Sequence, residues 1–226
     1  MPAGSRVSAT ESRLRRLAAP RRPEPGRQES GQQEPGPEGT GQQLEHCDLC
    51  REPVAPEHRH IVDLQARSLL CACRACTILF DRREAGGGHY RLVPERRLEL
   101  DGFRLDDAQW AAFRIPVELA FFFRSSGVGR VAAVYPSPAG ATESLLELEA
   151  WQDLERGNPV LLELEDDVEA LLVNRAGGRR DHFLVPIDDC YALAGLMRTH
   201  WKGFAGGGEV WREIDLFFDR LRERAR

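Results

Sequence analysis

Short apolar runs separated by turn residues characterise the chain from residue 44 to residue 94. Residues 61–64 and 68–71 are two such runs, and the three residues between them predict a β-hairpin. Beyond the hairpin, residues 76–80 predict a short helix, and residues 89–93, which follow three consecutive glycines, predict another strand. This part of the chain is therefore expected to form a small module.

The longer segment that follows, residues 95–226, contains further strand patterns. Residues 117–123 and 131–135 are rich in aromatic and β-branched side chains and predict two paired strands around a glycine-containing turn. Residues 168–173 and 182–186 predict a second pair, joined by a turn with two consecutive glycines. A sheet built from these strands is expected.

Helices are predicted between and after these strands. Asp106 is expected to cap one helix, and Asp188 or Asp189 is expected to cap another that starts at Cys190. Apolar residues at spacings of three and four within residues 209–224 predict a final helix with one buried face. The predicted class is α+β, in which a small zinc-ribbon-like module with four cysteines precedes a mixed α+β domain.

The first 43 residues have the composition of a disordered segment. Residues 1–43 contain six glycines, six prolines and no aromatic residue. Such a segment cannot bury enough apolar surface to offset its chain entropy. The predicted organisation is a disordered arm over residues 1–43, a four-cysteine metal-binding module over residues 44–94, and an α+β domain over residues 95–226.

The charge balance and the length of the apolar runs argue against several classes of protein. The 31 basic and 36 acidic residues give a net charge of -5, which creates no general attraction for nucleic acid. The longest strongly apolar run, residues 117–123, is far shorter than the roughly 20 residues that a membrane helix needs. The arginine pair at residues 15–16 is followed by prolines instead of the apolar stretch of an export signal. We therefore expect a cytoplasmic protein without nucleic-acid or membrane partners.

Five of the six cysteines fall within residues 47–76. Cys47 and Cys50 form one C-x-x-C pair, and Cys73 and Cys76 form another. This spacing turns two sulfurs toward one point about 2.3 Å from a zinc ion, and two such pairs complete a tetrahedron. Because disulfides are rare in the cytoplasm, the sequence predicts a closed, structural zinc site with these four ligands.

Neighbouring residues leave alternatives open for the ligands and for the metal. Cys71 can replace Cys73, although Cys73 is preferred because it completes the second C-x-x-C pair. His46, His58 and His60 are expected to lie at the surface or to support the ligands from behind, although one of them can replace a sulfur, since nitrogen also suits zinc. Four thiolates also accept a single iron ion, as in rubredoxin, and Cys71 can instead be a redox thiol.

No catalytic residue is predicted. The sequence offers no Ser-His-Asp order, nucleotide fingerprint or paired catalytic carboxylates. Cys190 follows two aspartates at a predicted helix start, where the helix lowers a thiol pKa and the carboxylates raise it. With no base assigned to it, Cys190 is expected to be a buried helix cysteine.

Several short sequence motifs occur together in this chain. They are CDLC (residues 47–50), HRHIVDL (58–64), LCACRAC (70–76), PVELAFFF (116–123), PIDDCY (186–191) and WKGF (201–204). In this combination the chain resembles an uncharacterised actinobacterial family, a domain of unknown function encoded in nickel-iron hydrogenase gene clusters. The resemblance covers nearly everything from Leu44 onward. It implies an accessory part in the assembly, maturation or electron wiring of a hydrogenase, with a hydrogenase subunit or maturation protein as partner.

Two functions are consistent with these patterns. The first is a non-catalytic zinc-binding accessory protein, in which zinc holds the module and the α+β domain contacts another protein. The second is a small redox protein with a rubredoxin-like iron site or a reactive thiol. Aromatic and arginine side chains often anchor interfaces. The candidates for a partner contact are Trp201, Phe204, Trp211, Arg198 and Arg212.

Overall fold

The computed structural model describes residues 45–137, 140–202 and 207–225. The predicted disordered arm and Phe204 lie outside these ranges. The described residues belong to one unit, which spans residues 43–226. Within them, no helix has the length and apolar character that crossing a membrane requires.

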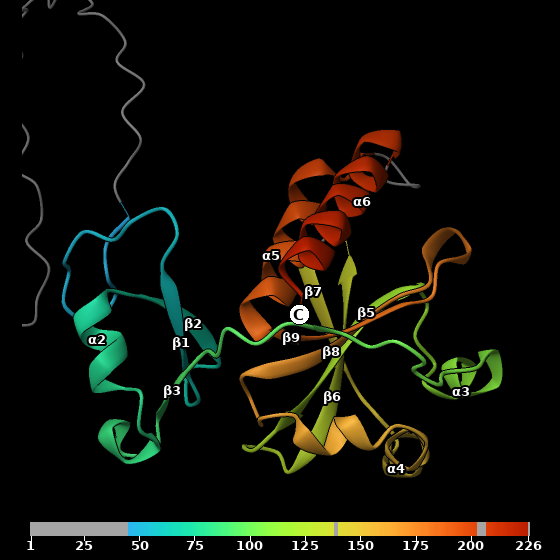
Figure 1. The fold of residues 1–226 in the computed structure, drawn as a ribbon, viewed down its shortest axis with the longest axis horizontal. Helices are drawn as coiled ribbons and strands as arrows, with labels where there is room; N and C mark the ends of the chain where they lie inside the picture. Colours follow the sequence, from blue (N-terminus) through green and yellow to red (C-terminus); the bar gives the residue numbers. More distant parts are fainter. Residues whose placement is uncertain (1–44, 138–139, 203–206, 226) are drawn as a thin grey trace, which may run out of the picture. The chain divides into compact units, whose positions relative to one another are not determined.

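A three-stranded antiparallel sheet is the centre of the first part of the chain (Figure 1). Its strands are β1 (Arg59–Asp63), β2 (Ser68–Ala72) and β3 (Tyr90–Leu92), in the order β2-β1-β3, and the helices α2 (Arg74–Leu79) and η1 (Arg83–Gly86) lie between β2 and β3 in sequence. Asp63 fixes the β1–β2 turn, because its Oδ1 accepts hydrogen bonds from the N–H groups of Gln65 and Ala66. The predicted hairpin, helix and third strand are confirmed.

A six-stranded antiparallel sheet follows. Its strands, in spatial order, are β4 (Leu98–Glu99), β9 (Asp181–Pro186), β8 (Glu169–Asn174), β5 (Leu119–Ser125), β6 (Arg130–Ser137) and β7 (Gly140–Leu145). Both predicted strand pairs are confirmed, and β5 joins them by pairing with β8. The edge strands β4 and β7 were not predicted. The two sheets and the helices that alternate with their strands along the chain confirm the α+β class.

Helices pack against both faces of the large sheet (Figure 1). The long helices α5 (Ile187–His200) and α6 (Gly207–Arg224) cover one face, and α3 (Asp107–Ala112), α4 (Leu148–Gly157) and η2 (Pro159–Glu163) belong to the other. Strand β5 shows why both faces are apolar. Leu119, Phe121 and Phe123 belong to the buried cluster on the side of α5 and α6. Ala120 and Phe122 belong to the cluster on the side of α3, α4 and η2.

The two predicted aspartate caps have different outcomes. Asp106 caps α3 with a complete capping box, in which its side chain and that of Gln109 each bind the other residue's backbone N–H. For α5 the prediction is wrong, because the helix begins at Ile187 and its N-cap is Pro186. Asp188 and Asp189 lie in the first turn of α5. Their carboxylates instead bind distant residues, since Asp188 Oδ2 lies 2.9 Å from His60 Nδ1 and Asp189 accepts hydrogen bonds from Arg97.

The small sheet packs directly on the core beneath α5. Val62 of β1 and Val93 after β3 belong to the same apolar cluster as Phe121 and Ile187. Polar contacts reinforce this packing, since Arg91 of β3 pairs with Glu165 at 2.9 Å. Side chains of the first 50 described residues therefore contribute to the core of the large sheet.

Candidate metal centre

The Sγ atoms of Cys47, Cys50, Cys73 and Cys76 all lie within 4.8 Å of one another. The first pair stands in a turn before β1, and the second pair stands at the start of α2, where Cys73 is the N-cap. The hairpin of β1 and β2 separates the two pairs in sequence and brings them together in space. The four-cysteine cluster predicted from the spacing is present.

Backbone geometry gives the first pair its compact turn. The N–H of Arg51 donates to the carbonyl of Cys47 at 2.8 Å, and the N–H of Cys47 donates to the carbonyl of Glu52 at 2.8 Å. Arg51 has a φ of 68°, in the left-handed region that favours glycine. The turn that places the two thiols side by side therefore contains a strained backbone conformation at Arg51, directly after Cys50.

Asp48, between the two cysteines of the first pair, ties this turn to β2. Its N–H donates to the carbonyl of Cys71 at 2.9 Å, and its Oδ2 accepts from the N–H of Cys71 at 2.8 Å. These two hydrogen bonds hold the turn against β2, the strand that leads into Cys73. Sequence reasoning missed this role, because it depends on a contact 23 residues away.

The sulfur separations suit a metal rather than a disulfide. Cys50 Sγ and Cys73 Sγ are 3.5 Å apart, and all the cysteines are free. A disulfide has an S–S bond of about 2.05 Å. Four sulfurs placed about 2.3 Å from a central zinc ion stand about 3.8 Å from one another. The cluster therefore has the dimensions of a tetrahedral thiolate site.

Most of the four-cysteine cluster is buried. Cys47, Cys73 and Cys76 are buried, and Cys50 is exposed. The remaining members of this small core are apolar. They are Val54, Ile61 and Ala72, with Leu49, Phe80, Tyr90 and Leu92 packed against them. The apolar wall excludes water from most of the site.

The thiols of the cluster shift one another's pKa values. Burial raises the pKa of Cys47, but hydrogen bonds from the N–H groups of Cys73, Cys50 and Leu49 outweigh it and lower the pKa to about 6. For Cys76, burial and the hydrogen bonds with the other three thiols raise the pKa. Four neighbouring negative charges repel one another, so the thiols ionise together only when a cation binds them.

The other residues weighed as ligands do not belong to the four-thiol group. Cys71 is half-buried, and burial followed by the charges of Asp48 and Glu45 raises the pKa of its thiol. It groups with His58 and His60 rather than with the four-cysteine cluster. His46 is exposed.

Cys190 is buried in the core under α5, as expected. Burial, followed by the negative charges of Asp189 and Asp188, raises the pKa of its thiol well above the ordinary value. An ionised, reactive thiol is therefore disfavoured at this position.

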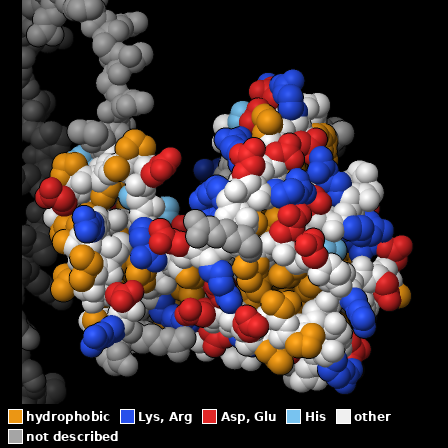
Figure 2. Space-filling view, in the orientation of Figure 1, with side chains coloured by type: hydrophobic (Ala, Val, Ile, Leu, Met, Phe, Trp, Pro, Cys, Tyr) orange, Lys and Arg blue, Asp and Glu red, His pale blue; other side chains and the backbone are white. Residues whose placement is uncertain are grey.

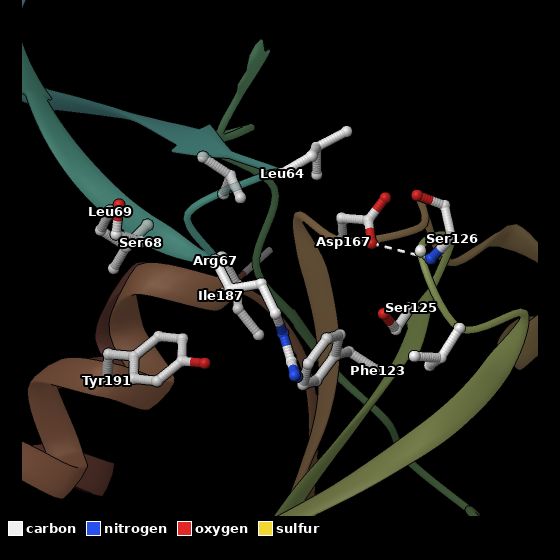
Figure 3. Close-up of a pocket in the computed structure, with 13 residues that line it drawn as sticks. Leu64, Arg67, Ser68, Leu69, Phe123, Ser125, Ser126, Asp167, Ile187 and Tyr191 are labelled. Carbon is white, nitrogen blue, oxygen red and sulfur yellow. Dashed lines mark hydrogen bonds between the residues drawn. The ribbon is translucent and has the colours of Figure 1, made fainter. Parts of the chain in front are cut away.

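A cavity of about 530 Å³ lies where the β1–β2 hairpin meets the large sheet and α5 (Figure 3). Its walls are mostly apolar and include Leu64, Leu69 and Phe123. Around its edge, Tyr191 and Asp167 add polar groups, and Asp167 accepts a hydrogen bond from the N–H of Ser126 at 2.8 Å. The lining contains neither cysteine nor histidine. Its residues come from distant segments, so no local pattern predicted it.

The residues expected to contact a partner differ in their exposure. Arg198, Trp211 and Arg212 are exposed on α5 and α6. Trp201 is partly buried and packs against the core beneath α5. Among the aromatic candidates that the structure describes, Trp211 is therefore the exposed one.

A family model matches residues 46–225 of the chain, and its description is "Family of unknown function (DUF5947)". The match covers most of the chain, so the protein belongs to this family. No curated protein and no solved structure matches it. The family membership agrees with the resemblance to an uncharacterised family and assigns no activity.

Proposed function

We propose that the protein is a non-catalytic accessory factor whose zinc-ribbon-like module is held by one zinc ion bound to Cys47, Cys50, Cys73 and Cys76. The supporting observation is the cluster of four free thiols within 4.8 Å of one another. Four thiolates fill the tetrahedral coordination sphere of zinc and leave no position for a substrate. Such a site stabilises a fold instead of performing a reaction.

The module has a surface that a partner can use. Helix α2 begins at the second cysteine pair, and its last two residues, Ile78 and Leu79, are 68% and 63% exposed. Figure 2 shows hydrophobic side chains on the surface in the region of α2. Large apolar side chains at this exposure are candidates for contact with another protein. Zinc would hold α2 in the orientation that presents them.

The partner that we propose is a hydrogenase subunit or maturation protein. This part of the proposal rests on the resemblance of the sequence phrases to proteins encoded in nickel-iron hydrogenase gene clusters. Accessory factors in assembly need a folded surface and no catalytic centre of their own. The closed thiol cluster and the exposed residues of α2 meet that need.

The partnership is tested in cells that make both proteins. The double substitution Ile78→Glu and Leu79→Glu adds two charges to α2, and we expect it to lower hydrogenase activity as much as deletion of the gene does. Leu162→Glu is the matched control, because Leu162 is 62% exposed in η2, on the other part of the fold. The control should leave activity unchanged. Normal hydrogenase activity in the deletion strain would refute the partnership.

A small redox protein is the second candidate, and one observation favours it. Cys50 is the exposed member of the cluster, so an iron ion bound there would have one sulfur ligand at the surface, where electrons can enter. Iron bound by four thiolates is coloured, whereas zinc has no visible absorption because its d shell is full. A coloured protein from native cells would favour the redox function, and a colourless protein with zinc would exclude the iron form.

A further inference from the structure

A second group of metal-binding side chains stands next to the four-cysteine cluster and shares no residue with it. One ring nitrogen of His58, one of His60 and the Sγ of Cys71 lie within 4.8 Å of one another. The strand register produces this arrangement. His60 in β1 pairs with Cys71 in β2, and directly paired residues point to the same face of a sheet. His58 lies directly before β1, and its ring centroid is 4.9 Å from that of His60.

Hydrogen bonds determine which nitrogen of each ring is available. His58 Nδ1 lies 2.9 Å from the carbonyl oxygen of Ala55, which can only accept, so Nδ1 carries the proton. His60 Nδ1 lies 2.9 Å from Asp188 Oδ2 in the first turn of α5. In each neutral ring, Nε2 is then the nitrogen with a free lone pair. Metal-binding histidines have this pattern, with the other nitrogen held by a carbonyl or a carboxylate.

An unpartnered buried atom points independently to a ligand. His58 Nε2 is buried and has no hydrogen-bond partner among the described residues. The side chain of His58 is only 8% exposed, so water does not replace that partner easily. A buried acceptor left without a hydrogen-bond partner destabilises the fold. A metal ion bound by Nε2 would remove this cost.

The surrounding charges favour a cation. Asp188 contacts His60, Glu45 Oε2 lies 3.6 Å from His58 Nδ1, and Asp48 accepts the hydrogen bond from the N–H of Cys71. Three carboxylates therefore surround the two rings and the thiol.

We propose that His58, His60 and Cys71 form a second metal site, which binds zinc or a similar borderline transition metal through two Nε2 atoms and one thiolate. Two imidazoles and a thiolate are soft enough for such metals and too soft for magnesium or calcium. Three protein ligands leave one tetrahedral position open, in contrast to the closed four-cysteine site. Water or a side chain of a partner protein can occupy this position. Since Asp188 belongs to α5, an ion here would also connect the small sheet to the large domain.

Zinc titration of the full-length, metal-free protein against a chromophoric chelator tests the proposal. Wild-type protein should bind two equivalents, and His58→Ala or Cys71→Ser should bind one. His46→Ala is the matched control, because His46 is an exposed histidine of the same module, and it should keep two equivalents. Asp188→Asn removes only the carboxylate that orients His60, and we expect the second equivalent to bind 10–100-fold more weakly.

The four-cysteine site serves as an internal check on folding. A variant that binds one equivalent with the affinity of the tighter wild-type site has kept the module folded, so its loss of the second equivalent is specific. Binding of only one equivalent by wild-type protein at excess zinc would overturn the proposal. Retention of two equivalents by both His58→Ala and Cys71→Ser would also overturn it. Neither result would affect the proposal for the four-cysteine site.

Discussion

Replacement of Cys73 with serine tests whether metal, rather than apolar packing, holds the small module. Besides the cysteines, the buried residues of this core are Val54, Ile61 and Ala72, while Leu49, Phe80, Tyr90 and Leu92 pack against it partly buried. Burial of a valine and an isoleucine contributes about 1.5–3 kcal/mol each, or about 3–6 kcal/mol together. A structural zinc ion contributes about 10–16 kcal/mol. Loss of the metal should therefore unfold this module.

The assay combines zinc content with limited trypsin digestion. Cys73→Ser protein should lose its bound zinc and be cut quickly after arginines such as Arg74, whereas residues 95–226 should resist cleavage. Cys50→Ser is informative because Cys50 is exposed, so its substitution removes a ligand with little loss of packing, and we expect the same result. Cys190→Ser should keep its metal. Full zinc content and wild-type resistance to trypsin in Cys73→Ser protein would refute the reasoning.

Further predictions concern strain, acid and the first segment. Arg51→Gly should raise the melting temperature by about 2–4 °C, because relief of about 1–2 kcal/mol of left-handed strain exceeds the added chain entropy; an unchanged or lower value would contradict this. Burial lowers the pKa of His182 to about 4 from the ordinary 6.5, so the unfolded chain gains a proton first as pH falls. The free energy of unfolding should drop by up to about 3 kcal/mol between pH 6.5 and 4, and His182→Phe should remove this drop in denaturant titrations. Removal of residues 1–43 should leave melting temperature and zinc content unchanged, because this segment has no aromatic side chain; a fall of several degrees would show that it packs on the fold.

Local patterns predicted the parts of the fold that depend on neighbouring residues. The β1–β2 hairpin and α6 follow from the periodicity of nearby residues, and the four-cysteine cluster follows from two C-x-x-C pairs that are each local. Strand β7 was missed because Thr142, Glu143 and Ser144 form a polar run without the apolar alternation of a strand. It pairs with β6 at the edge of the sheet, where a strand needs fewer apolar side chains because less of it is buried.

Long-range contacts determine what the sequence could not show. The sequence did not predict the group of His58, His60 and Cys71, because their proximity depends on the strand register. The carboxylate that orients His60 comes from Asp188, 128 residues away. The cap prediction for α5 was wrong because the helix begins at Ile187, three residues before Cys190, which places Asp188 and Asp189 in its first turn.

X-ray absorption at the metal K-edge tests the central claim most directly. The measurement uses Cys71→Ser protein, purified from native cells without added metal, so that only the four-cysteine site contributes. The edge identifies the element, and the fine structure gives the number and distance of the ligands. We expect zinc with four sulfur ligands at about 2.3 Å. Iron at the edge, fewer than four sulfurs around each ion, or protein that contains no metal would contradict it.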